Sequence, residues 1–191
     1  MKTTAFAAAL AVSASLVAGS AYAASNAAFL KTAIQGDNAE IQMGQLAEQK
    51  GGTQNVRQFG QTLVTDHTKA KDQAMSVAQQ LGVKAPSGIP AAAHKEYQKL
   101  QGMSGASFDR EFASFMVKDH RKVINQFQRQ AKSGSKATAA LATKQLPTLR
   151  KHLQMAERLT SSSTMKNSNS MMRSTTGTSQ SGGGTRNGAN R

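Results

Sequence analysis

The chain has 191 residues, no cysteine, no tryptophan and a formal net charge of +14. The missing cysteine excludes disulfide scaffolds, thiolate metal sites and cysteine nucleophiles. Hydrophobic residues make up 38% of the chain and aromatic residues only 5%. This composition allows a packed core of small size.

The first 23 residues have the pattern of a secretory signal peptide. Lys2 gives a positive start, residues 5–19 are almost all apolar or serine, and residues 21–23 form an A-x-A cleavage site. The apolar run is too short for a good membrane span, and no later stretch approaches about 20 apolar residues. We predict cleavage after Ala23 and export of a mature chain without a transmembrane segment, with the periplasm as its destination. An uncleaved N-terminal anchor is the alternative.

Residues 161–191 form a tract rich in Ser, Thr, Gly and Asn that carries basic residues and no acid. Such a segment buries too little apolar area to offset its ordering entropy, which predicts a disordered basic tail. The domain then spans residues 24–160 and keeps a net charge of about +9. That charge suits docking on an anionic envelope surface, or simply a well-solvated surface. Specific nucleic-acid binding is not expected, because no aromatic residues alternate with the basic ones.

Apolar residues recur at helical spacing in four blocks, and no block shows sustained strand alternation. The blocks predict helices over about 26–50, 53–81, 107–132 and 136–159. A polar connection with prolines separates the second helix from the third and leaves room for a short helix at about 91–100. The expected fold is all-α, a four-helix bundle in a single domain.

An internal repeat relates the second and third predicted helices. Residues 59–70 (FGQTLVTDHTKA) and 112–123 (FASFMVKDHRKV) share the pattern F-x4-V-x-D-H-x-K. The long connection between these helices predicts a crossover along the bundle, which makes the two helices parallel and brings their Asp-His pairs to the same height. The ferritin-like variant of the four-helix bundle has one such long crossover.

Four segments, which together cover nearly the whole domain, resemble a known family: FLKTAIQGDNAEIQMGQLAEQK (29–50), FGQTLVTDH (59–67), FDREFASFMVKDH (108–120) and LPTLRKHLQMAERL (146–159). The family is the exported bacterial domain of unknown function 4142, of the ferritin-like superfamily. The resemblance implies a ferritin-like four-helix bundle. It implies no established reaction.

Polar residues interrupt the apolar faces of all four predicted helices. At about 100° per residue, Asp66 and His67 flank the centre of the apolar stripe on the second helix. Asp119 and His120 take the equivalent places on the third helix.

The first and fourth helices add further polar residues near this height. His152 lies close to the centre of the fourth stripe, Asp37 near the middle of the first stripe, and Glu40 near its edge. Counting back from the hairpin turns places Glu40 and His152 within about one turn of the two Asp-His pairs. The convergence predicts a candidate metal site whose ligands or their supporting groups are His67, His120, His152, Asp66, Asp119 and Glu40.

Imidazole and carboxylate together suit zinc, iron, copper or nickel. Met43, Met116 and Met155 lie three or four residues from the candidate ligands and would suit Cu(I), although methionines at helical spacing usually fill the core. A di-iron carboxylate centre is not expected, because the chain has no Glu-x-x-His. His94 lies in the crossover and is expected at the surface.

Two functions remain open at this point. The chain has no G-x-S-x-G elbow, no S-x-x-K box and no phosphate-binding loop ahead of a helix, which argues against an enzyme. A buried His beside an Asp is often only a hydrogen-bonded pair that holds two helices in register. We therefore expect a non-catalytic structural, stress-related or surface-interaction protein. The alternative is a periplasmic metal-binding protein with its site in the bundle core.

Overall fold

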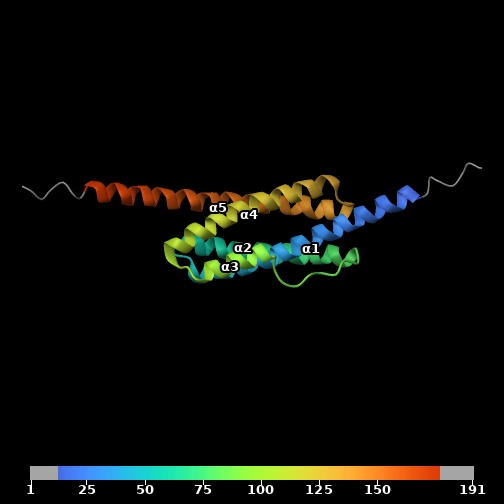
Figure 1. Ribbon diagram of the computed structural model, residues 1–191, viewed down its shortest axis with the longest axis horizontal. Coiled ribbons are helices and arrows are strands. Elements are labelled where there is room, and N and C mark those ends of the chain that lie inside the picture. The colour runs from blue at the N-terminus through green and yellow to red at the C-terminus, as the bar shows by residue number, and fades with distance from the viewer. Residues whose placement is uncertain (1–12, 177–191) are drawn as a thin grey trace, which may run out of the picture.

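The computed structural model describes the backbone of residues 13–176 and the side chains of residues 21–162. Over this range the regular elements are all helices, as Figure 1 shows. They are α1 (Ser13–Lys50), α2 (Gln54–Gln80), α3 (Ala91–Gln101), α4 (Gly105–Ser133) and α5 (Lys136–Thr176). The prediction of an all-α fold is confirmed. The short α3 occupies the connection where the sequence left room for a helix.

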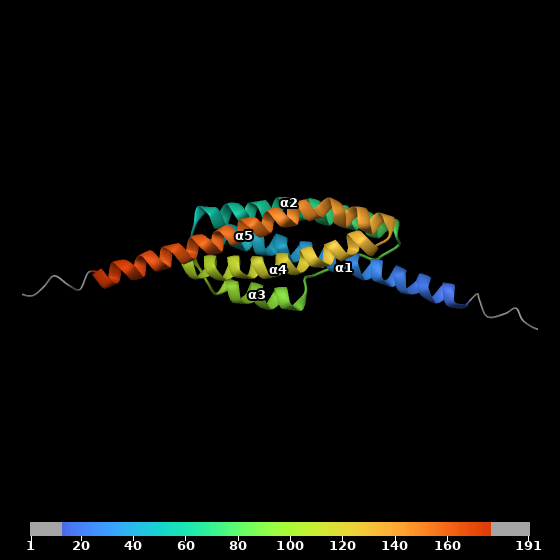
Figure 2. The same ribbon diagram turned by 90° about the horizontal axis from the view of Figure 1, so that it is seen from above.

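The four long helices form two hairpins, α1 with α2 and α4 with α5, as both views show (Figures 1 and 2). The connection between the hairpins returns along the bundle, so that α2 and α4 begin at the same end. Gly51 and Gly105, just before α2 and at the start of α4, form a parallel backbone bridge. His67 and His120 lie at similar distances along the chain from this bridge, which places them at the same depth.

Glycines and one buried carboxylate fix how the hairpins meet. A Cβ atom on Gly44 would lie 2.7 Å from the carbonyl oxygen of Gly60, so the backbones of α1 and α2 approach closely. Asp109 of α4 is buried and accepts hydrogen bonds from the backbone amides of Gly52 (2.7 Å) and Thr53 (2.9 Å). The carboxylate oxygens therefore accept hydrogen bonds from amides at the N-terminus of α2, where a helix favours an anion.

The buried apolar residues fall into two clusters. Both draw on α1, α2, α4 and α5, and the first is Phe29, Leu30, Ala33, Ile34, Ala74, Ala78, Ile124, Phe127, Leu141, Ala142, Leu146 and Leu149. The second lies toward the other end and is Met43, Leu46, Ala47, Val56, Phe59, Leu63, Leu100, Phe108, Phe112, Met116 and Ala156. Between them lies a polar layer, made of Asp37, Glu40, Asp66, His67, Asp119, His120 and His152.

The outermost helices extend further than the sequence predicted. α1 begins at Ser13 instead of about residue 26, and five alanines and Leu16 favour the helix in this upstream segment. α5 continues to Thr176, into the tract predicted to be disordered. At the start of this tract Ser161 and Ser162 donate to the carbonyls of Glu157 and Arg158, one turn earlier in the helix. Residues 1–12 of the predicted signal peptide and 177–191 of the predicted tail lie outside the described residues.

Both extensions project beyond the bundle (Figures 1 and 2). On α1 the side chains of residues 21–25 are exposed, and Asn26 is the first buried residue after them. Among the side chains that the structure describes, burial therefore begins three residues after the predicted cleavage site. Within residues 13–176, none of the helices has the length and apolar character needed to cross a membrane.

Candidate metal centre

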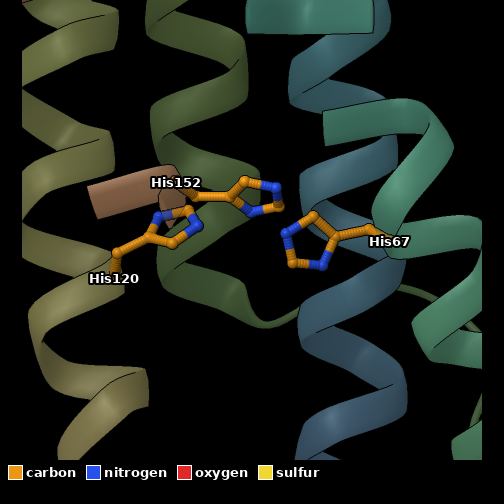
Figure 3. Close-up of side chains that lie close together, drawn as sticks. All are labelled: His67, His120 and His152. Carbon is orange, nitrogen blue, oxygen red and sulfur yellow. The ribbon is translucent and has the colours of Figure 1, made fainter. Parts of the chain in front are cut away.

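Three buried histidines from three different helices meet in the polar layer. His67 lies on α2, His120 on α4 and His152 on α5, and their side chains turn toward one another in Figure 3. Their ring centroids are 5.2–6.0 Å apart. One nitrogen from each ring lies within 4.8 Å of a nitrogen of the other two, and each residue is at most 4% exposed.

Each ring uses its other nitrogen to bind an oxygen. His67 Nδ1 donates to Asp37 Oδ1 at 2.8 Å, and His152 Nε2 donates to Asp66 Oδ2 at 2.8 Å. His120 Nδ1 donates to the carbonyl oxygen of Met116 at 3.0 Å. Carboxylate and carbonyl oxygens in these contacts accept, so the proton of each neutral ring sits on the nitrogen that faces them.

The remaining nitrogens are His67 Nε2, His120 Nε2 and His152 Nδ1. All three are buried and have no hydrogen-bond partner. In a neutral ring the opposite nitrogen carries the proton, so each of them presents a lone pair when its ring is neutral. Three lone pairs in one small volume repel one another, and they match the donor set that a cation needs. In metal proteins a ligating histidine normally donates its other N–H to a carboxylate or a backbone carbonyl, as all three do here.

Burial keeps two of the rings uncharged. Burial, followed by the charge of His67, lowers the pKa of His120 to about 3 and that of His152 to about 4. The Met116 carbonyl opposes the shift at His120, and Asp66 opposes it at His152. Both rings are therefore neutral at physiological pH, with their lone pairs available.

His67 behaves differently because it faces more negative charge. Burial acts to lower its pKa, but the hydrogen bond to Asp37 and the charges of Glu40, Asp37 and Asp66 outweigh burial and raise it. Burial also raises the pKa of Asp37, against the opposing effect of His67. In the metal-free protein the Asp37–His67 pair thus holds its proton to higher pH, and a metal ion would have to displace that proton.

The predicted carboxylates lie in the polar layer but outside the group of three histidines. Asp66 supports His152 and is no member of the group whose ligand atoms converge. Glu40 and Asp119 form a pair through their side chains. Burial is the main reason that the pKa of Glu40 rises to about 8 and that of Asp119 is also raised. The two carboxyl groups therefore share a proton beside the histidines.

A cavity of about 310 Å³ adjoins the histidines. All three rings line it, together with Asp37 and Glu40. Exposed lysines also reach it from α2, α4 and α5: Lys69, Lys122 and Lys144. The lone pairs therefore face a space that solutes can enter, and a metal bound there would keep an open coordination position.

Two groups that take part in this site, the Asp37 carboxylate and the Met116 carbonyl, were not predicted from the sequence. Asp37 was placed near the middle of the first apolar stripe, but its bond to His67 depends on how α1 and α2 pack. The Met116 carbonyl belongs to the backbone one turn before His120. Every residue has such a carbonyl, so the sequence cannot single it out as a partner. Met116 itself packs in the apolar cluster, and His94 is exposed on α3, apart from the other histidines.

Comparison with known proteins gives a family and no activity. Residues 11–159 match the family described as Domain of unknown function (DUF4142). The chain belongs to this family. The matched range holds the three histidines and their oxygen partners, so the polar layer lies wholly within the DUF4142 domain. No curated protein and no solved structure matches the chain.

Proposed function

We propose that this DUF4142 protein is an exported metal-binding protein, built as a ferritin-like four-helix bundle, that holds a transition metal at His67, His120 and His152. One observation carries the proposal: the three buried ring nitrogens that face one another all lack a hydrogen-bond partner. Buried polar atoms in native proteins are nearly always satisfied. A metal ion would satisfy all three nitrogens at once.

The donor set restricts the metal. Three neutral imidazoles suit zinc, copper and iron, and a tetrahedral zinc site with three protein ligands keeps its fourth position open. Asp37 and Asp66 bring negative charge to the far sides of two rings, which raises the basicity of those ligands. Met43 and Met116 pack in the apolar cluster next to the layer, so the proposal does not rely on thioether ligands.

A structural role is the second candidate, and the cross-helix pairs support it. Asp37–His67 joins α1 to α2, and Asp66–His152 joins α2 to α5. Such pairs would hold the helices in register without a metal. This reading leaves the three inward nitrogens without a partner, and for that reason we favour the metal site.

The start of the packed region supports export. The predicted cleavage site at Ala23 lies within the exposed residues 21–25, and the buried core begins at Asn26. Removal of the signal peptide would therefore keep every residue that the structure describes as buried, although Asn26 Nδ2 would lose its acceptor, the Tyr22 carbonyl at 2.9 Å. The net charge of about +9 in the domain would favour residence near anionic envelope surfaces.

Thermal unfolding of the untagged chain, with and without zinc or copper, tests the proposal. A ligand that binds only the native state stabilises it by about 2.7 kcal/mol at a hundredfold excess over Kd, so the melting temperature should rise by several degrees. The double variant His67→Ala/His120→Ala should lose this shift. His94→Ala is the matched control, because it removes an exposed histidine, and should keep the shift. The proposal is contradicted if neither zinc nor copper changes the melting temperature of the wild-type chain.

A further inference from the structure

The cavity beside the histidines is larger than a metal ion requires. Its volume of about 310 Å³ is at the lower end of the range for small-molecule pockets and far exceeds the space of one water. Part of its wall comes from small side chains: Ala33, Gly36, Ala39, Ala92 and Ala93.

Gly36 opens this cavity from α1. A Cβ atom built on Gly36 would meet no atom within 4 Å, unlike one on Gly44 or Gly60. Glycine inside a helix costs about 1 kcal/mol relative to alanine, so the free space comes at some cost in helix stability. The crossover closes over the same region, because Asn38 donates to the carbonyl of Gly88 at 3.1 Å and Pro90 lines the cavity.

Two carboxyl oxygens in the cavity wall still lack a partner. Asp37 Oδ2 and Glu40 Oε2 are buried and accept no hydrogen bond, and both residues line the cavity beside the histidines. A metal on the three ring nitrogens would leave both oxygens unsatisfied. An occupant that meets them must bring an N–H or O–H group.

We propose that the cavity binds a small neutral nitrogen base that carries an N–H group, coordinated to the metal through its lone pair and hydrogen-bonded to Glu40 Oε2. Imidazole-type rings fit this description, because they combine a compact apolar body with one lone pair and one N–H. This inference rests on the proposed metal site and goes beyond it by assigning the open coordination position to a class of ligand. Glu40 Oε2 is buried without a hydrogen-bond partner and lines the cavity, so it is placed to accept this N–H.

Cobalt(II) bound at the three histidines of the full chain should give a visible absorption spectrum that changes when a further ligand is added. Imidazole should change the spectrum saturably while the cobalt stays bound. 1-Methylimidazole has the same lone pair but no N–H, and acetate is an anion; both should bind about tenfold more weakly or worse, the loss of one hydrogen bond. In Glu40→Met the preference for imidazole over 1-methylimidazole should disappear.

Gly36→Leu tests the cavity itself. The leucine side chain would enter the open space, so imidazole affinity should fall by about tenfold or more while cobalt binding is retained. Gln35→Leu adds the same side chain one residue away, outside the cavity lining, and should behave as wild type. The inference is overturned if the cobalt-bound chain does not respond to imidazole, if Gly36→Leu binds imidazole normally, or if the imidazole preference survives in Glu40→Met. If cobalt gives no visible spectrum with the chain, the proposed metal site is overturned. The proposed nitrogen-base ligand, which depends on that site, is then overturned as well.

Discussion

Two buried polar clusters of the bundle differ in whether their buried side-chain atoms all have hydrogen-bond partners. Near one end, Asn26 Oδ1 accepts from Gln130 Nε2 (2.8 Å), Thr138 Oγ1 (2.8 Å) and the amide of Ser135 (3.0 Å). None of these four residues has a buried side-chain atom without a partner. In the polar layer, five buried side-chain atoms lack one: Asp37 Oδ2, Glu40 Oε2, His67 Nε2, His120 Nε2 and His152 Nδ1.

This difference separates a structural role from a binding role. The Asn26 cluster joins the start of the packed part of α1 to the turn between α4 and α5, and it is complete as it stands. The polar layer costs stability in the metal-free protein, because its unpartnered atoms are buried without compensation. Such a layer is explained when an added group supplies the missing partners.

The largest expected effect is the response of Glu40 to pH. Burial raises its pKa from 4.5 to about 8, so the native state keeps a proton that the unfolded chain releases between these values. The stability contributed by this protonated group is present below pH 4.5 and is lost as pH rises through 8, by up to about 5 kcal/mol. Glu40→Gln stays neutral and should therefore be progressively more stable than wild type from pH 5 to pH 8.5. Urea unfolding of the two metal-free proteins at several pH values measures this difference. The prediction is contradicted if their free energies of unfolding change with pH in the same way.

Asn26→Ala should produce the next largest effect, and only on stability. It leaves Gln130, Thr138 and the Ser135 amide without their shared acceptor, which should cost about 2 kcal/mol. Zinc affinity should stay unchanged, because the cluster lies outside the polar layer. Urea unfolding and a zinc titration on the same variant check both halves. A large loss of zinc affinity would show that the two clusters are not separate in role.

Asp66→Asn should produce the smallest effect, confined to metal affinity. The variant keeps an acceptor for His152 Nε2 but removes the negative charge that supports the ring, and such supporting groups contribute about tenfold or more to affinity. Asp72→Asn on the exposed side of α2 is the matched control and should bind zinc as wild type does. Equal zinc affinities in the two variants would leave Asp66 with a purely structural role.

Helical periodicity and the internal repeat predicted the inward faces of His67, His120 and His152, because side-chain direction along a helix follows from spacing alone. The pairing of the carboxylates did not follow in the same way. Neighbours in sequence diverge by about 100° around a helix, so Asp66 reaches His152 on another helix instead of His67 beside it. α1 and α5 also extend further than the spacing of apolar residues predicted.

The most direct test of the central claim is X-ray absorption at the zinc edge of the zinc-loaded, untagged chain. The account predicts one zinc per chain with three imidazole nitrogens at about 2.0–2.1 Å and one further light-atom ligand. In His120→Phe the imidazole count should fall. A shell of oxygens alone, or a spectrum that His120→Phe leaves unchanged, would contradict the assignment of the three histidines as a metal site.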